Sequence, residues 1–164
     1  MGIAQDTFQQ YRDNAYEGQV SSLESAKIVS RRVETAALAF GKPVISGSGA
    51  RSCTGVTGAT VAADIEGFTV RSLAVENDSN GNAVYAVGVL ASIIREGKIY
   101  AKCVDGATAK DHVFIVVNVA GGNALGDLRG TADGTNTIEL THVTWTDDVA
   151  AGAIGEIDLG IILA

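Results

Sequence analysis

The sequence is poor in the residues that most enzyme and metal chemistry requires. Its 164 residues include two His, two Cys and one Pro, and the two imidazoles, His112 and His142, stand in no catalytic motif. Nucleophilic catalysis needs a Ser or Cys within reach of a base, and a zinc site needs spaced pairs of Cys or His. We therefore expect no enzyme activity, with no catalytic residue, no bound metal and no cofactor.

The four His and Cys residues have structural interpretations. His142 shares an alternating pattern with Ile138 and Leu140, which predicts a histidine in the core or at its boundary. His112 follows Asp111 at the start of an apolar run and is expected at the surface. Cys53 and Cys103 are far apart in a chain without an export signal, so two free thiols are expected rather than a disulfide.

Charge is also scarce and is mostly negative. The chain has 12 Lys and Arg against 19 Asp and Glu, a net charge of −7, and its longest basic run is Arg31-Arg32. Binding to duplex nucleic acid requires clustered cations, so nucleic acid is not an expected partner. The polar N-terminus and the lack of any run of about 18 apolar residues predict neither a secretion signal nor a membrane span.

Two loops resemble ligand-binding motifs only in composition. The run GSGARS (47–52) lacks the third glycine of a dinucleotide loop and the Gly-Lys-Ser or Gly-Lys-Thr ending of a phosphate loop. The run ENDSNGN (76–82) lacks the ligand spacing of a calcium-binding loop. A flexible surface loop and a solvated turn are the expected structures.

The residues that are abundant predict strands and turns. Apolar residues make up 46% of the chain, and twenty glycines help to separate short apolar runs with no helix-length stripe between them. The fold class is therefore expected to be all-β, a small β-barrel or β-sandwich. The strand-sized runs are 68–75, 83–90, 92–95, 98–104, 112–119, 137–145 and 156–163.

Individual runs permit finer predictions. Alternation in 156–163 predicts that Ile157, Leu159, Ile161 and Leu163 share one buried face, and the apolar run VFIVV (113–117) predicts a central strand covered on both faces. The runs 92–95 and 98–104 are expected to form a hairpin with its turn at Glu96-Gly97. Residues 28–40 fit either a helix or a strand. The glycine-rich stretch 120–136 is expected to be a long loop.

The N-terminal residues differ from the rest. Residues 1–27 are polar, lack a sustained period and contain Phe8, Tyr11 and Tyr16, so we expect an extended arm preceding a barrel or sandwich domain at 28–164. The three aromatic side chains could fold back on their own domain or dock on a neighbouring subunit. Together with Arg31 and Arg32, they are the predicted contact residues for another protein subunit.

The order of features resembles one known family. YRDNAYEGQV, then VSRRVETAALAFGKPV before a Gly/Ser loop, then LASIIREGKIYAKCVDG and a glycine-rich stretch before the closing strands, are similar to the structural cement or decoration proteins of tailed-bacteriophage capsids. The more specific pieces are AFGKPV (39–44) and the segment around Arg95 to Val104. The long 105–136 region departs from the shorter family members.

The resemblance implies a β-barrel or β-sandwich with an N-terminal arm that binds the outer surface of the icosahedral shell. Such a protein would clamp neighbouring major capsid protein subunits as a homo-oligomer, with a trimer favoured and a dimer possible. It would be made in the cytoplasm of the bacterial host and located on the virion.

A different class of function is a ligand-binding β-barrel, such as a carbohydrate-binding module or a receptor-binding tip. It requires exposed aromatic side chains, for which Tyr85, Tyr100 and Trp145 are the candidates outside the arm and the short strand cores. An enzyme on a β-scaffold, a lyase or an esterase, is the least favoured class.

Overall fold

The computed structural model describes residues 15–73 and 75–160, and its fold is all-β, as the sequence predicts. Two short 3₁₀ turns, η1 (Ala62–Asp64) and η2 (Gly134–Asn136), are the helical elements of the described residues. The strands are β1 (Val20–Val33), β2 (Pro43–Ser46), β3 (Ser52–Gly55), β4 (Ile65–Thr69), β5 (Glu76–Asn77), β6 (Ala83–Val84), β7 (Leu90–Lys102), β8 (His112–Val116), β9 (Leu128–Arg129), β10 (Thr137–Trp145) and β11 (Ile154–Leu159).

A barrel forms one half of the molecule. The strand order β1-β3-β2-β4-β7 closes on itself because β1 also pairs with β7. Within it, the ring of Phe40 meets that of Tyr85 edge to face, with centroids 5.4 Å apart, and the Tyr85 hydroxyl donates to the backbone oxygen of Val70. The small apolar core of this half consists of Val33, Leu38, Phe40, Val44, Cys53, Tyr85, Ala91 and Ile93.

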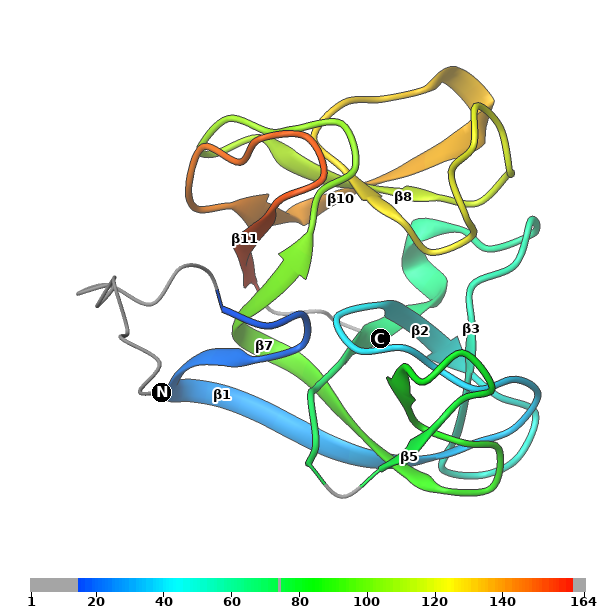
Figure 1. Ribbon diagram of the computed structural model, residues 1–164. Coiled ribbons are helices and arrows are strands. Elements are labelled where there is room, and N and C mark those ends of the chain that lie inside the picture. The colour runs from blue at the N-terminus through cyan, green and yellow to red at the C-terminus, as the bar shows by residue number, and fades with distance from the viewer. Residues whose placement is uncertain (1–14, 74, 161–164) are drawn as a thin grey trace, which may run out of the picture.

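A second layer continues from the barrel through β7. The order β7-β11-β10-β8-β9 extends the same sheet, so that β8, β10 and β11 occupy the upper part of Figure 1 and β1, β2, β3 and β5 the lower part. The larger apolar core spans both parts of the sheet, because it contains Ile65 and Phe68 of β4 as well as Trp145 of β10. The Trp145 side chain is fully buried, and its Nε1 donates to the Arg129 backbone oxygen.

The predicted hairpin at Glu96-Gly97 is wrong, because 90–102 is one continuous strand. Gly97 has a φ of +111°, and it lies where β7 changes partners. Before it, Ile94 pairs with Phe68 of β4, and from Gly97 onward β7 pairs with β11, beginning at Leu159. Gly97 therefore allows a bend within a strand and does not form a turn that reverses the chain.

The predicted core or boundary position of His142 is also wrong, since its side chain is exposed. The register of β10 against β8 shifts between Leu140 and Thr144. This irregularity inverts the alternation, so that Val143 and Trp145 are buried together with Leu140. The His142 backbone oxygen accepts from the Gly160 amide.

Residues 28–40 were expected to form either a helix or a strand, and residues 28–33 belong to strand β1. Beyond this strand, Leu38 forms an isolated β-bridge with Tyr85. Ile157 and Leu159 are buried on one face as predicted, whereas Ile161 and Leu163 lie outside the described residues. The stretch 120–136 is not a featureless loop, because it contains β9 and η2.

The strand predicted to be central, β8, does pair on both edges, with β10 and β9. Val113, Ile115, Val116 and Val117 are buried, and Phe114 is the residue of 113–117 that keeps partial exposure. Both faces of this run are therefore covered except at Phe114.

Both cysteines are free and fully buried, as predicted, and they belong to different cores. Desolvation by burial raises the pKa of each thiol to about 11.

The expected division between arm and domain, at 27/28, falls inside β1, whose N-terminal part pairs with β7 from Val20 onward.

Candidate functional site

Of the predicted contact residues, Phe8 and Tyr11 lie outside the described residues, and Tyr16 is 58% exposed. The Cζ atom of Arg71 lies 4.8 Å from the centroid of the Tyr16 ring and 5.2 Å from that of Phe40. This cation–π arrangement holds Tyr16 against its own barrel while leaving part of the ring accessible. Beside it, Leu73 is 98% exposed at an open groove of about 710 Å³.

Arg31 and Arg32 point to opposite sides of β1, as neighbouring residues of a strand must. Arg31 forms an ion pair with Glu66, a carboxylate that is only 3% exposed and also accepts a hydrogen bond from the Ser46 hydroxyl. Arg32 is exposed. The structure therefore separates the two predicted residues: Arg31 is engaged in the fold, and Arg32 is accessible to another molecule.

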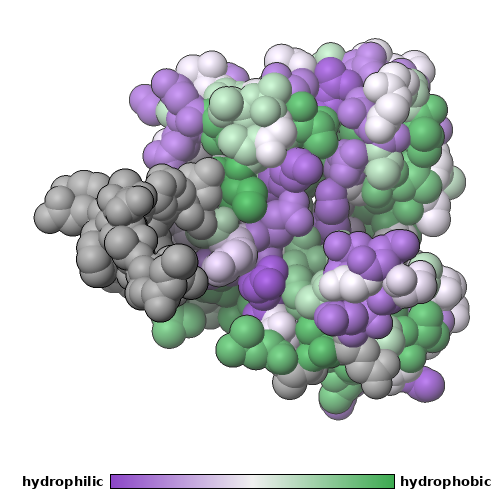
Figure 2. Space-filling view, in the orientation of Figure 1, coloured by the Kyte–Doolittle hydropathy of each residue, from purple (hydrophilic) through white to green (hydrophobic). Residues whose placement is uncertain are grey.

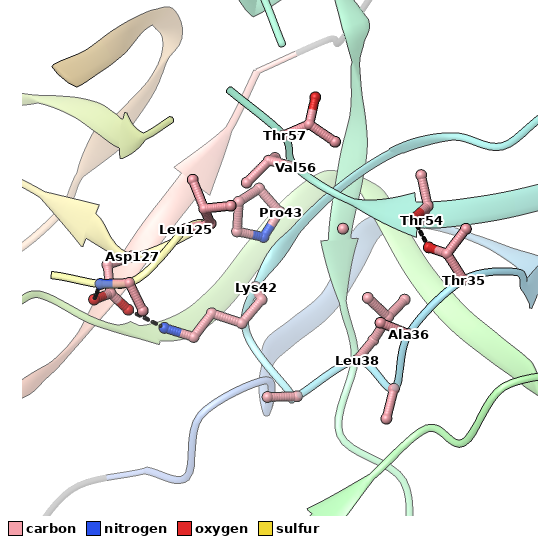
Figure 3. A pocket seen from close by; sticks show the side chains of 15 residues that line it. Thr35, Ala36, Leu38, Lys42, Pro43, Thr54, Val56, Thr57, Leu125 and Asp127 are labelled. Atoms are coloured by element: carbon pink, nitrogen blue, oxygen red, sulfur yellow. Dashed lines mark hydrogen bonds and ion pairs between the residues drawn. The ribbon is translucent and has the colours of Figure 1, made fainter. Parts of the chain in front are cut away.

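A pocket of about 350 Å³ lies where the barrel meets the glycine-rich stretch (Figure 3). An ion pair between Lys42 Nζ and Asp127 Oδ1, at 2.7 Å, crosses its side. Ala36, Leu38 and Leu125 give the pocket an apolar lining. Because Lys42 and Asp127 pair with each other, the pocket presents an apolar surface to a bound group and, among the described residues that line it, no free reactive side chain.

The GSGARS run is the connection between β2 and β3, and its amides already have an anionic partner. The Glu34 carboxylate accepts hydrogen bonds from the backbone N–H groups of Ser48 and Gly49, at 2.8 and 2.7 Å. These bonds, that of Ser48 first, lower the pKa of Glu34 to about 2. The Glu34 carboxylate therefore occupies the position beside these amides that a bound phosphate would take.

The remaining candidate motifs form structural contacts. Asp78 accepts from the amides of Asn80 and Asn82, as in a solvated turn, and His112 Nδ1 contacts Glu139 Oε1 near the surface. In 15–73 and 75–160, no group of three or more His, Cys, Asp and Glu is placed to hold a metal ion. Across the same ranges, no helix is both long and apolar enough to cross a bilayer.

Two of the three aromatic side chains predicted for a carbohydrate-binding site are buried. Tyr85 and Trp145 are 2% and 0% exposed, and Tyr100 is partly buried. Sugar recognition through these three residues would require an accessible ring face. The burial of two of them argues against this alternative.

Exposed aliphatic residues are the feature that the sequence analysis missed. They occur in several segments, and Figure 2 shows hydrophobic residues at the lower edge of the molecule, where Figure 1 places the barrel. The apolar run 83–90 was interpreted as a strand, although Gly88 within it indicates a turn. The exposed aliphatic residues are Leu23, Ile28, Val61, Leu73, Val87, Val89, Leu90, Val119 and Leu125.

Comparison with known proteins yields a family and a structural neighbour. The sequence profile of the family described as "Structural cement protein (E217 gp24/Pam3 gp6)" matches residues 4–160. No match was found among curated proteins. A solved chain from "The capsid of Myoviridae Phage XM1" aligns over 99% of this chain and 100% of its own length, with a TM-score of 0.74 and 16% identity, which shows a shared fold.

A closed barrel with exposed aliphatic residues, and a family match over nearly the whole chain, lead to one conclusion: the chain belongs to the phage structural cement protein family, and its role is that of a capsid cement or decoration protein.

Proposed function

We propose that this protein binds the outer surface of an icosahedral capsid shell and clamps neighbouring major capsid protein subunits, without catalysing a reaction. The observation that carries the proposal is the family match over residues 4–160. The protein is made in the cytoplasm of the bacterial host and becomes part of the virion. Its protein partners are the major capsid protein and further copies of itself, with a trimer favoured over a dimer, and neither nucleic acid nor a membrane is involved.

The distribution of side chains supports a protein partner. Leu23, Leu73 and Leu90 are 83%, 98% and 66% exposed. Singly exposed aliphatic residues are ordinary, but here several occupy turns and strand ends, where they are accessible to a large flat surface. Many weak contacts of this kind add up on a shell that repeats the same site many times.

Among the predicted contact residues, Tyr16 and Arg32 are proposed to touch a partner because both are exposed, and Phe8 and Tyr11 remain proposed contacts of the arm. Arg31 contributes indirectly, because its ion pair with Glu66 fixes β1. The arm is proposed to add contacts with a neighbouring subunit.

The test is a binding isotherm. Purified protein is mixed with expanded, undecorated capsids of the phage that encodes it, and bound protein is measured after sedimentation. Saturable binding at or below micromolar concentration is expected, and an absence of binding at that concentration would overturn the proposal. Analytical ultracentrifugation of the free protein determines the oligomeric state, and a monomer at all accessible concentrations would contradict the homo-oligomer.

A further inference from the structure

The end of the barrel formed by residues 86–90 carries a compact apolar patch flanked by two cations. Val87, Val89 and Leu90 are 54%, 38% and 66% exposed within four consecutive residues. Arg32 and Arg51 are also exposed, and a backbone hydrogen bond joins them. We call these five residues the barrel-tip patch.

The patch is built from three segments that hydrogen bonds hold together. The Val89 amide donates to the Ala86 oxygen across a tight turn in which Gly88 has a φ of +86°, a combination typical of a type II turn. The turn is fastened to β1 by bonds from Gly88 N to Val33 O and from Val33 N to Val89 O. The patch is therefore held in a fixed shape before any partner binds.

The backbones of both arginines lie at this same end of the barrel. Arg32 is the register partner of Leu90, and its Nη2 lies 3.9 Å from the position a Cβ would take at Gly88. The Arg32 amide donates to the backbone oxygen of Arg51, which places the β2–β3 connection next to it.

Neither arginine of the patch has an ion-pair partner among the described residues, in contrast to Arg31, Lys42, Lys98 and Arg129. The one carboxylate in the segments 30–34, 47–52 and 86–92 is Glu34, and the amides of Ser48 and Gly49 already engage it. In a chain of net charge −7, two free guanidinium groups around an apolar turn are complementary to carboxylates on a partner.

We propose that the barrel-tip patch docks on the capsid shell, at a surface where carboxylates surround an apolar depression. Val87, Val89 and Leu90 enter the depression, and Arg32 and Arg51 pair with the carboxylates at its rim. This inference rests on the proposed function. Charge complementarity favours an acidic surface, and five residues are far fewer than the roughly 20–30 per partner of a stable pairwise interface. A contact of this size suits a partner that repeats it across a lattice.

The experiment compares shell binding of the full-length protein with that of L90S and R32E/R51E. Matched controls are V119S, which removes an aliphatic residue exposed to a similar degree, and K102E/K110E, which reverses two exposed cations of the second layer. Both patch variants are expected to weaken binding about tenfold or more, and both controls to leave it within about twofold. Added salt should weaken wild-type binding and affect R32E/R51E less.

The outcomes separate the two proposals. If the wild type binds shells and the patch variants bind equally well, the patch assignment is overturned while the proposed function stands. If the wild type itself does not bind, both fail. If the patch variants bind shells normally but sediment as smaller species, a second copy of the chain covers the patch and the assignment to the shell is wrong.

A measurement on the wild-type protein keeps the test independent of how the variants fold. Phenylglyoxal modifies accessible guanidinium groups, and mass spectrometry locates the modified residues. Arg32 and Arg51 are expected to react in the free protein and to be protected in the shell-bound protein. Equal modification in the two states would overturn the assignment.

Discussion

The Cα atom of Ala26 lies 3.0 Å from the position that a Cβ atom would take at Gly97, so β1 passes directly over the bend of β7. Gly97 also has a φ of +111°, a conformation that L side chains rarely adopt. The bend that joins the two halves of the molecule thus depends on a residue without a side chain.

Gly97→Ala is expected to lower the free energy of unfolding by about 2–4 kcal/mol, because strain at a positive φ is added to a backbone clash. Gly152→Ala is the control, since Gly152 has a φ of +78° with open space around it, and its cost should be about 1 kcal/mol. Urea unfolding of both variants measures the difference. Equal costs would show that the close approach of Ala26 does not constrain position 97.

Arg31→Met is expected to destabilise the protein by about 3 kcal/mol, because it leaves the buried Glu66 carboxylate without its cation. Arg32→Met, one residue along the strand, should change stability by less than about 0.5 kcal/mol. Thermal unfolding compares the two. The double variant R31M/E66L should recover much of the loss, and a failure to recover would mean that Arg31 acts through packing instead.

The lowered pKa of the Glu34 carboxylate predicts that the stability of the fold depends on pH in the acid range. Its pKa falls from 4.5 in the unfolded chain to about 2 in the folded protein, chiefly through the Ser48 amide. A depressed pKa stabilises the fold above the unfolded value, and that contribution is lost as the pH falls from 4.5 to about 2. Wild type should therefore melt at a higher temperature than Glu34→Gln at neutral pH, and this difference should vanish near the lower pKa. A difference independent of pH would refute the assignment.

Deletion of residues 1–14 tests the arm without removing β1. Every described contact of Tyr16 and of β1 remains in the truncated chain, so its unfolding midpoint should stay close to that of the wild type. Its affinity for undecorated shells, or the stability of its oligomer, should fall. Sedimentation with shells and analytical ultracentrifugation measure these quantities. A truncated protein that does not fold would instead make the N-terminal segment part of the core.

Much of the fold could be predicted from local patterns, because alternation reports which face of a strand is buried. The run 137–145 coincides with β10, and Ile157 and Leu159 are buried as their spacing predicts. The errors arise where a strand departs from regular pairing. The irregularity after Leu140 exposes His142, and a glycine that commonly marks a reversal instead bends β7 at Gly97.

The candidate site was less predictable, because its residues come together only in three dimensions. The sequence places Arg31 and Arg32 side by side, but whether either is free depends on Glu66, which is distant in sequence and paired with Arg31. The exposed turn at Val87 resembles a strand by composition alone. Only its bonds to Val33 reveal that it stands at the end of the barrel.

The continuity of β7 has a mechanical consequence. This strand borders β1 and β4 in the barrel and β11 in the second layer, with no loop between its two halves. A force that pulls the barrel tip away from the second layer is therefore carried along the covalent backbone of β7. Such a force loads the hydrogen bonds from β7 to β1 and β11 in shear, so that many of them resist together instead of opening one after another. The two halves of the molecule therefore resist stretching together, as one continuous unit.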